Sequence, residues 1–499
     1  MSGDDAAPVA VIDIGSNSIR LVVYDRHARS PFPRFNEKSL CGLGKALDAT
    51  GELPSSAFEC TLKALERFVG IARAMRAVRI DVIATEAVRR AGNGPALVEA
   101  ARARAGCEMR ILSGEEEARM AALGVASGFY AAHGLMGDLG GGSLELCSIH
   151  RGEVTDDLIS LPLGTLRVDP LLARGPDVAK AAVDRLLKDA LPKGGIDTFY
   201  AVGGSWRALA RVHMAMDDAP LHNVHGYEIP FKKARALTKA LRGVAAGEAA
   251  GLPGVPPRRV PQVAAAALVL DRVLKRLAPE RIVFSALGVR EGWLYATLPE
   301  HERTQDPLNA GARDFGRPRA RVPEIGPAMI RWTDALFIDE TPAETRLRHA
   351  ACELSDIGWR DHPDVRATDT FHRLSQLPFI GLDHKERVHL AAIVHARYDG
   401  RDDEPSLQPA LSLLAARERG RAQVLGRAMR LGYRFSGSVP ALLGQARLRI
   451  GPDVVRLEVG TDAALPDSEP VRACLKSLAK ALGLRRAEIR VVSPSTTSD

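Results

Sequence analysis

Two short glycine-rich stretches place acids, glycines and serines at matching positions. IDIGSNSIRL spans residues 12–21 and GDLGGGSLEL spans residues 137–146. The residues that could contact phosphate or a cation are Asp13, Gly15, Ser16, Asn17 and Ser18 in the first stretch, and Asp138, Gly140, Gly141, Gly142, Ser143 and Glu145 in the second. Backbone N–H groups at glycine turns point outward and bind anions. Two such turns facing each other across a cleft would therefore clamp a phosphate group.

The acids and two arginines complete the requirements of phosphoryl transfer. That reaction needs donors around the phosphate oxygens, a divalent metal and a group that orients the attacking oxygen. Asp138 and Glu145 are hard oxygen ligands suited to Mg²⁺, and Asp13 is a carboxylate for a metal-bound water. Arg89 in ATEAVRRA and Arg290 in LGVREG are the candidate guanidinium groups, because arginine can hold two phosphate oxygens at once.

A candidate base lies in the stretch SGEEEARMAALGVAS. Ser113 is predicted to cap a helix here, and Glu116 follows three residues later at capping-box spacing. Glu116 is a candidate base, although the local pattern gives no reason to prefer it over Glu115 or Glu117 and is equally typical of a helix cap. Each glycine turn alone is also typical of an ordinary hairpin; their repetition favours a site. The chain has no GxxxxGK[ST] motif, which disfavours a P-loop enzyme.

The surrounding elements predict an α/β fold with two similar lobes. Residues 9–25 read as a hairpin, and strands alternate with amphipathic helices up to about residue 295. We expect an N-terminal lobe over 1–130 and a second lobe over 131–300, because the hairpin motif occurs once in each. A stretch rich in Pro, Gly and Arg predicts a linker over 301–322. A helical domain over 323–438 and a small α/β domain over 439–499, with a disordered tail SPSTTSD, complete the chain.

The composition limits the kinds of partner that the chain could bind. The 499 residues are 46% hydrophobic and 26% charged, and no apolar run approaches the roughly 20 residues of a membrane span. A net charge of +7 fits an anionic partner, or simply a composition that favours arginine. Zinc-finger spacing and RNP-like motifs are absent from the sequence, which disfavours nucleic acid. The N-terminus has no export signal, and the six cysteines have neither metal-ligand spacing nor disulfide-scaffold density, so we expect a reducing cytoplasm.

Seven motifs together resemble one family. IDIGSNSIRLVVYD, ATEAVRRA, SGEEEARMAALGV, DLGGGSLE, LPLGTLR, VGGS and LGVREGWLY occur over about residues 9–296 in the order of the exopolyphosphatase / guanosine pentaphosphate phosphohydrolase (Ppx/GppA) family. This family is a branch of the actin-like ATPase superfamily. The resemblance implies duplicated ribonuclease-H-like lobes around a cleft and magnesium-dependent hydrolysis of a terminal phosphoanhydride.

The resemblance also implies roles for single residues. Glu116 would be the catalytic glutamate, and Asp138 and Glu145 the carboxylates tied to metal and catalysis. The positions that match phosphate contacts are Ser16, Asn17, Arg89, Ser143 and Arg290.

The C-terminal segments resemble the HD-like third domain and the small fourth domain of the longer family members. Ser355 stands where an HD pair would need its histidine, directly before Asp356. We therefore expect no metal centre there, but a scaffold that extends a basic channel or forms a homodimer interface.

The motifs leave four functions to compare. A processive exopolyphosphatase, releasing orthophosphate from inorganic polyphosphate, fits best. A guanosine pentaphosphate (pppGpp) phosphohydrolase, or an enzyme with both activities, is the alternative. A non-catalytic sensor of polyphosphate or ppGpp is disfavoured, because Glu116, Asp138 and Glu145 are all present. A sugar-kinase-like ATPase is disfavoured because Trp206 and Arg207 suit an adenosine pocket poorly.

Overall fold

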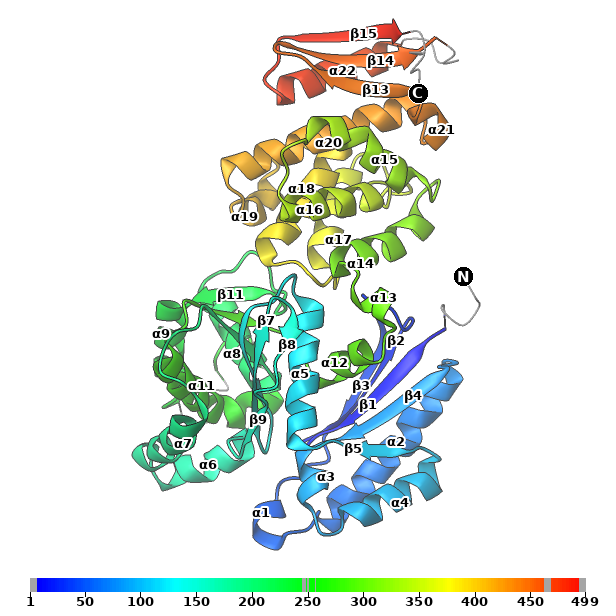
Figure 1. Ribbon diagram of the computed structural model, residues 1–499. Coiled ribbons are helices and arrows are strands. Elements are labelled where there is room, and N and C mark those ends of the chain that lie inside the picture. Colours follow the sequence, from blue (N-terminus) through cyan, green and yellow to red (C-terminus); the bar gives the residue numbers. More distant parts are fainter. Residues whose placement is uncertain (1–6, 245–247, 249–250, 256, 462–467, 493–499) are drawn as a thin grey trace. The chain divides into compact units, whose positions relative to one another are not determined.

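The computed structural model describes residues 7–244, 248, 251–255, 257–461 and 468–492 (Figure 1). The chain divides into two compact units, residues 1–304 and 305–499. The predicted disordered tail lies outside the described residues. Among the residues that the structure describes, no helix is both long and apolar enough to cross a membrane.

The first sheet of unit 1 is built on the predicted N-terminal hairpin. Its strand order is β3-β2-β1-β4-β5, with β1 antiparallel to β2 and parallel to β4. Apolar clusters lie on both sheet faces, which explains why β1 reads as a nearly continuous apolar run. The strands are β1 (Val9–Ile14), β2 (Ile19–Tyr24), β3 (Pro33–Ser39), β4 (Arg79–Ala84) and β5 (Met109–Ile111). The helices of this part are α1 (Leu47–Thr50), α2 (Ser55–Ala74), α3 (Glu86–Arg90) and α4 (Gly94–Ala105).

The second sheet repeats the order of the first. Its path is β11-β12-β10-β6-β7-β8, with β9 also paired to β7. The hairpin β6–β7 corresponds to β1–β2, and β10 runs parallel to β6 as β4 does to β1. The strands are β6 (Gly134–Leu139), β7 (Leu144–His150), β8 (Glu153–Val154), β9 (Ile159–Leu161), β10 (Thr198–Val202), β11 (Tyr227–Pro230) and β12 (Arg281–Phe284). The helices are α6 (Thr165–Arg174), α7 (Pro176–Ala190), α8 (Gly204–Met216), α9 (Phe231–Leu241) and α11 (Val263–Leu277), preceded by the 3₁₀ helix η1 (Pro257–Gln262).

The internal repeat holds in its hydrogen bonds. Gly15 N donates to Ser18 O and Gly140 N donates to Ser143 O, both at 3.0 Å. The carbonyl of Ser16 and that of its counterpart Gly141 each accept from a later backbone N–H. Each of the two sheets therefore carries the same turn at the same place in its hairpin.

Two helices join the sheets, α5 (Gly114–Gly128) and α12 (Val289–Ala296), and they pack against each other (Figure 1). Glycines allow the close approach. A Cβ at Gly124 would lie 2.2 Å from the carbonyl oxygen of Gly288, and one at Gly292 would lie 1.7 Å from that of Met120. Because α5 carries the SGEEEA acids and α12 carries Arg290, this contact fixes both groups relative to the two turns. The short helix α13 (Glu300–Arg303) ends unit 1.

Unit 2 is helical up to residue 443 and ends in a small sheet. The helices are α14 (Pro307–Gly316), α15 (Ile325–Thr333), α16 (Pro342–Leu354), α17 (Arg366–Gln376), α18 (His384–Arg397), α19 (Gln408–Leu411), α20 (Ala416–Ser436) and α21 (Pro440–Leu443), with short 3₁₀ segments η2 (Arg317–Arg319), η3 (Asp334–Leu336) and η4 (Pro405–Leu407). The sheet has the order β13-β14-β15. Its elements are β13 (Ala446–Ile450), β14 (Val454–Gly460), α22 (Glu469–Ala481) and β15 (Arg486–Val492).

The predicted linker over 301–322 was wrong, because helices occupy most of it. Asp306 caps α14 by accepting from Asn309 N at 2.8 Å, and Pro307 stands at the first helical position. Leu308, Ala310 and Ala312 are buried. The buried face of α14 consists largely of small residues, so the composition of the stretch resembled that of a connector.

Arginines surround the acid that follows Ser355. Asp356 is 1% exposed and accepts from Arg321 at 2.7 Å and from Arg397 at 3.3 Å. The hydroxyl of Ser355 instead lies 2.7 Å from that of Tyr433. Guanidinium groups therefore supply the positive charge beside this carboxylate.

Candidate active site

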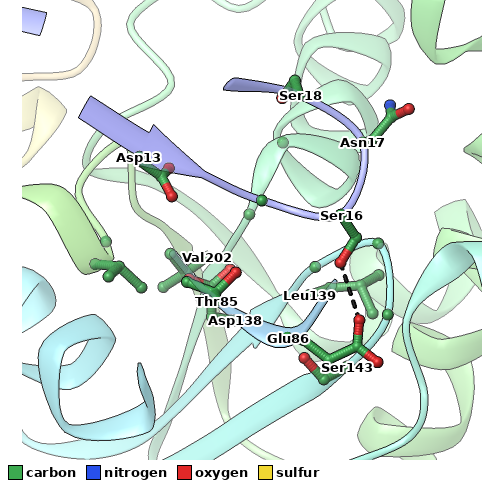
Figure 2. Close-up of a pocket in the computed structure, with 18 of the residues that line it drawn as sticks. Asp13, Ser16, Asn17, Ser18, Thr85, Glu86, Asp138, Leu139, Ser143 and Val202 are labelled. Carbon is green, nitrogen blue, oxygen red and sulfur yellow. Dashed lines mark hydrogen bonds between the residues drawn. The ribbon is translucent and has the colours of Figure 1, made fainter. Parts of the chain in front are cut away.

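A pocket in unit 1 brings the two glycine turns together (Figure 2). The turn between β1 and β2 and the turn between β6 and β7 both line it, together with the starts of α3, α8 and α12. All four predicted phosphate residues of the first turn lie here: Gly15, Ser16, Asn17 and Ser18. So do all four of the second turn: Gly140, Gly141, Gly142 and Ser143.

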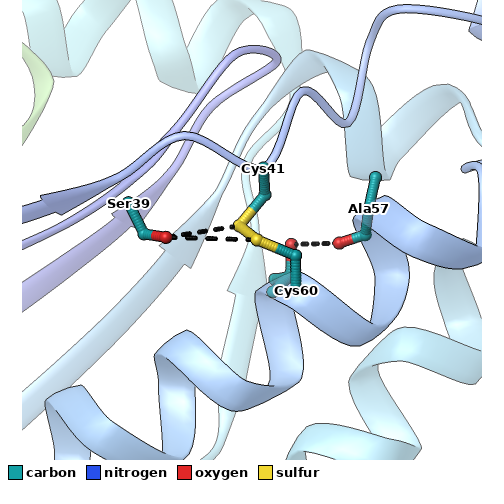
Figure 3. Close-up of a disulfide and its surroundings, with 5 residues drawn as sticks. Ser39, Cys41, Ala57 and Cys60 are labelled. Carbon is teal, nitrogen blue, oxygen red and sulfur yellow. Dashed lines mark hydrogen bonds between the residues drawn. A yellow bond between two sulfur atoms is a disulfide. The ribbon is translucent and has the colours of Figure 1, made fainter.

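The first turn is held from behind by a short segment after β3. Gly44 N donates to Ser16 O at 2.7 Å, and Gly42 N donates to Asn17 O at 3.1 Å. This segment begins at Cys41, whose sulfur forms a disulfide with that of Cys60 on α2 (Figure 3). The scattered cysteines had pointed to a reducing compartment, whereas the fold brings these two to a Cα–Cα distance of 5.6 Å. The position of the turn thus depends on a cross-linked loop.

The second turn is held by the start of α6 and has no room for side chains at its third glycine. Leu166 N donates to Gly141 O at 2.8 Å. A Cβ at Gly142 would lie 2.0 Å from Oε2 of Glu86, the first residue of α3. The third glycine of the run therefore has a steric reason: the backbone there passes directly against a buried carboxylate.

The predicted metal-binding acids face each other across a hairpin. Asp138 and Glu145 are directly paired in the register of β6 and β7, and both line the pocket. Two like charges at such a position repel each other. Burial raises the pKa of Asp138 to about 6, and burial followed by the nearby Glu117 holds the pKa of Glu145 well above its ordinary value. A cation at this point would relieve both effects.

Three arginines line the same pocket as the acids. Arg290 donates to Asp13 at 2.9 Å, and its buried Nε has no hydrogen-bond partner among the described residues. Arg20 is paired with Asp13 in the hairpin register, and Arg207, in the first turn of α8, donates to Ala286 O at 2.6 Å. Burial, with Arg290 and Arg20 nearby, lowers the pKa of Arg207 to about 10. These arginines lie in a pocket that five acids also line, so the lining offers groups both for phosphate oxygens and for cations.

Comparison with known proteins identifies the family. Residues 22–301 match the sequence model of the Ppx/GppA phosphatase family, and residues 310–489 match that of "Exopolyphosphatase, C-terminal". The chain belongs to the Ppx/GppA phosphatase family. The resemblance seen in the seven motifs is thereby confirmed.

Several proteins of known name are similar to this member of the family. Exopolyphosphatase 1 of Mycobacterium leprae is 29% identical over 304 residues, which cover 58% of this chain and 89% of the relative. Retrograde regulation protein 2 of Saccharomyces cerevisiae is 26% identical over 463 residues, covering 83% of this chain and 77% of the relative. The solved structure of the Aquifex aeolicus PPX-GPPA enzyme matches with a TM-score of 0.50 and 24% identity, over 58% of this chain and 98% of that one. This likeness shows a shared fold.

In this Ppx/GppA chain the pocket acid on α5 is Glu117, not Glu116. Glu116 completes the capping box: its carboxylate accepts from Ser113 N at 2.8 Å and from Arg110 at 2.7 Å, and it does not line the pocket. These contacts lower the pKa of Glu116. Glu117 is 8% exposed and lines the pocket, and burial raises its pKa to about 7 against the opposing charge of Arg89. The assignment of Glu116 is therefore corrected by one residue.

Arg89 also has a different place from the predicted one. It donates to Glu117 at 3.1 Å and to Leu112 O at 2.6 Å, and it is not among the residues that line the pocket. It contacts the site through the carboxylate of Glu117, which itself lines the pocket. Of the predicted residues, Asp13, Asp138, Glu145 and Arg290 do line the pocket.

The sequence contained signals for two of the residues that were missed. Glu117 shares a helical face with the buried Ala121 and Gly124, four and seven residues later, whereas Glu116 does not. Arg20 directly faces Asp13 once the hairpin register is drawn. For Arg207 and Glu86, no local pattern distinguished them from surface charges.

Proposed function

We propose that the chain is an exopolyphosphatase that hydrolyses the terminal phosphoanhydride of inorganic polyphosphate with the aid of Mg²⁺. The observation that carries the proposal is the pocket itself, in which two phosphate-type turns face buried acids and arginines. Membership of the Ppx/GppA family and the names of the mycobacterial relatives support it.

In the proposed mechanism the two turns hold the terminal phosphate. The N–H groups of Ser16–Ser18 and Gly141–Ser143 would surround its oxygens, and Arg290 would add a guanidinium donor. Glu117 lies in the same pocket with a raised pKa, so it is suited to accept the proton of the attacking water. Preorganised donors of this kind stabilise the charge that develops on the phosphoryl oxygens.

Asp138 and Glu145 fit a divalent cation, because opposed buried carboxylates need a positive partner and offer the oxygen donors that Mg²⁺ prefers. Among the described residues, no group of three or more metal-type side chains is close enough to form a complete cage. The two acids would therefore share the ion with water and substrate phosphates, as is usual for Mg²⁺. When bound, the ion would neutralise charge on the phosphates.

Hydrolysis of guanosine pentaphosphate is the less favoured alternative. The pocket lining consists of glycines, polar and charged residues, and a few aliphatic ones, with no aromatic ring among the described residues on which a guanine could stack. A chain of phosphates needs no such platform. Polyphosphate is therefore the better match to this lining.

We further propose that the helices of unit 2 form an HD-like scaffold without a metal, and that two chains associate as a homodimer. The match of residues 310–489 to the exopolyphosphatase C-terminal family and the arginine partners of Asp356 support the scaffold. Sedimentation of the purified chain tests the dimer. A cytoplasmic location stays a prediction from the sequence.

Orthophosphate release tests the main proposal. The purified chain would be incubated with Mg²⁺ and with long-chain polyphosphate, guanosine pentaphosphate or ATP at equal concentrations of terminal phosphate. We expect fastest release from polyphosphate, with long chains persisting while product accumulates if the enzyme is processive. Faster release from guanosine pentaphosphate would favour the alternative, and binding without release from any substrate would favour a sensor.

A further inference from the structure

Glu86 is an acid in a place where a phosphate site has no evident need of one. It begins α3, is 5% exposed, and lines the pocket beside both glycine turns (Figure 2). A bare carboxylate there would repel an anionic ligand. Neither the family resemblance nor the proposed mechanism uses it, so its contacts must explain its presence.

The carboxylate of Glu86 joins three parts of unit 1. Its Oε2 accepts from the Ser16 hydroxyl at 3.0 Å, and its Oε1 accepts from Arg90 at 2.7 Å and from Arg167 at 3.0 Å. Arg167 belongs to α6, next to the second turn, so Glu86 links the first turn to the second lobe. Arg90 also donates to Asp48 at 2.6 Å. The two guanidinium groups offset the charge of Glu86 and hold it in place.

The contact with Ser16 determines what that hydroxyl can offer the pocket. A hydroxyl has one proton, and an ionised carboxylate can only accept a hydrogen bond. While the contact lasts, the Ser16 proton therefore points to Glu86, and only oxygen lone pairs are left for a ligand. A phosphate oxygen also accepts, so Ser16 cannot donate to phosphate until it leaves Glu86.

We propose that Glu86 is a positioning residue that keeps the Ser16 hydroxyl turned away from the phosphate cradle until a phosphate group binds. Binding exchanges the Ser16–Glu86 hydrogen bond for a Ser16–phosphate hydrogen bond. The inference rests on the proposed function only in taking phosphate as the ligand. It also gives Gly142 a purpose, because any side chain there would displace Glu86 from Ser16.

Equilibrium binding of inorganic phosphate and tripolyphosphate tests this without relying on turnover. Glu86→Gln keeps the shape, and its amide can donate to Ser16, which frees the serine proton for the ligand. We expect the Kd to fall about fivefold, the usual value of one hydrogen bond. In Ser16→Ala the same change should tighten binding clearly less, because only the loss of charge remains. An equal gain with and without the Ser16 hydroxyl, or weaker binding in Glu86→Gln, would overturn the proposal.

Two further variants separate charge from hydrogen bonding. Asp48→Asn removes one negative charge from the same cluster but does not touch Ser16, so it should tighten binding by less than Glu86→Gln. Glu86→Asp keeps the charge while withdrawing the carboxylate from Ser16, so it should also tighten binding, and it serves if Glu86→Gln does not fold. An Asp48→Asn effect as large as that of Glu86→Gln, or no gain in Glu86→Asp, would refute the role of the hydrogen bond.

Kinetics add an independent readout where the enzyme turns over. The KM for tripolyphosphate should follow the Kd in each variant, while kcat changes less, because Glu86 contacts no reacting atom. A wild-type chain that binds phosphate but releases none would refute the exopolyphosphatase proposal and leave the binding test intact. A wild type that turns over but shows no Ser16-dependent gain would refute only the role of Glu86.

Discussion

Replacing the neighbouring acids Glu116 and Glu117 one at a time distinguishes the cap from the base. Both are glutamates in one helical turn, but they face different surroundings. Glu116 closes the capping box of α5 and pairs with Arg110 at the surface, whereas Glu117 is buried in the pocket beside Arg89. Glutamine at either position keeps the size of the side chain and removes only the negative charge.

The expected magnitudes differ by orders of magnitude. A general base contributes about 10²- to 10⁴-fold to a rate, so Glu117→Gln should lower kcat by that factor. The Kd for polyphosphate should not rise, because the change removes a negative charge from the pocket. Glu116→Gln can still complete a capping box, and its exposed ion pair with Arg110 is worth at most about 1 kcal/mol. Its kcat should stay within about twofold of the wild type.

Orthophosphate release at saturating polyphosphate, together with the Kd from equilibrium binding, gives both numbers. Thermal unfolding of each variant checks that α5 is intact. Loss of turnover in Glu116→Gln, with full turnover in Glu117→Gln, would refute the assignment of the base. If Glu117→Gln lost binding as well as turnover, its role would be structural rather than catalytic.

Three other perturbations test the metal site, the disulfide and unit 2. In the wild type, Mg²⁺ at a hundredfold excess over its Kd should add about 2.7 kcal/mol to the free energy of unfolding measured in urea titrations. Asp138→Asn should lose most of this gain. An unchanged gain would exclude Asp138 as a ligand. Cys60→Ser removes the disulfide between Cys41 and Cys60, which are 19 residues apart in the sequence. The loss should lower the free energy of unfolding by about 3 kcal/mol and raise the KM for polyphosphate. A variant with wild-type stability and KM would show that the Ser16 turn does not need the disulfide. Burial lowers the pKa of His389 to about 4, so the unfolded chain takes up the proton first and stability falls as the pH drops from about 6.5 to 4, by about 3 kcal/mol. Glu386, with a pKa raised by burial to about 7, adds about 3 kcal/mol of stability as the pH falls from 7 to 4.5, so the two groups nearly cancel in the wild type. On acidification His389→Gln should therefore gain about 3 kcal/mol of stability relative to the wild type, and an unchanged pH profile of urea unfolding would contradict this.

Local sequence patterns predict much of the fold. Two apolar strands around a Gly-Ser-Asn turn, β1 and β2, predicted the first hairpin, and the similar pattern at β6 and β7 predicted the second. The turn residues of both hairpins line the pocket, as predicted. The capping box at Ser113 was also visible, because its partners lie three residues apart. Turns and helix caps, whose partners lie within a few residues of each other, can therefore be predicted from the sequence alone.

The features that could not be predicted are those that depend on which side of a helix is buried. The run of three glutamates after Gly114 offers three candidates, and the structure shows that Glu117 is the one that is buried and lines the pocket. Arg89 belongs to a motif associated with phosphate contact, yet one nitrogen of its guanidinium donates to both Glu117 and Leu112 O. The same limit affected α14, where a face of small residues is buried in a stretch whose composition is polar.

The repeat explains how one hairpin can make an asymmetric catalytic site. The two turns keep the same backbone geometry, with glycine donating to the serine carbonyl at 3.0 Å in each, so the phosphate-binding part is duplicated. The charges are not, because the position opposite the acid is Arg20 in the first hairpin and Glu145 in the second. In the first hairpin the aspartate therefore has arginine partners within the protein, Arg20 in the register and Arg290 by an ion pair, while the second hairpin leaves two opposed carboxylates. In the proposed mechanism this one divergent position would separate a side that binds phosphate from a side that binds the cation, and hydrolysis of a terminal phosphoanhydride would use both.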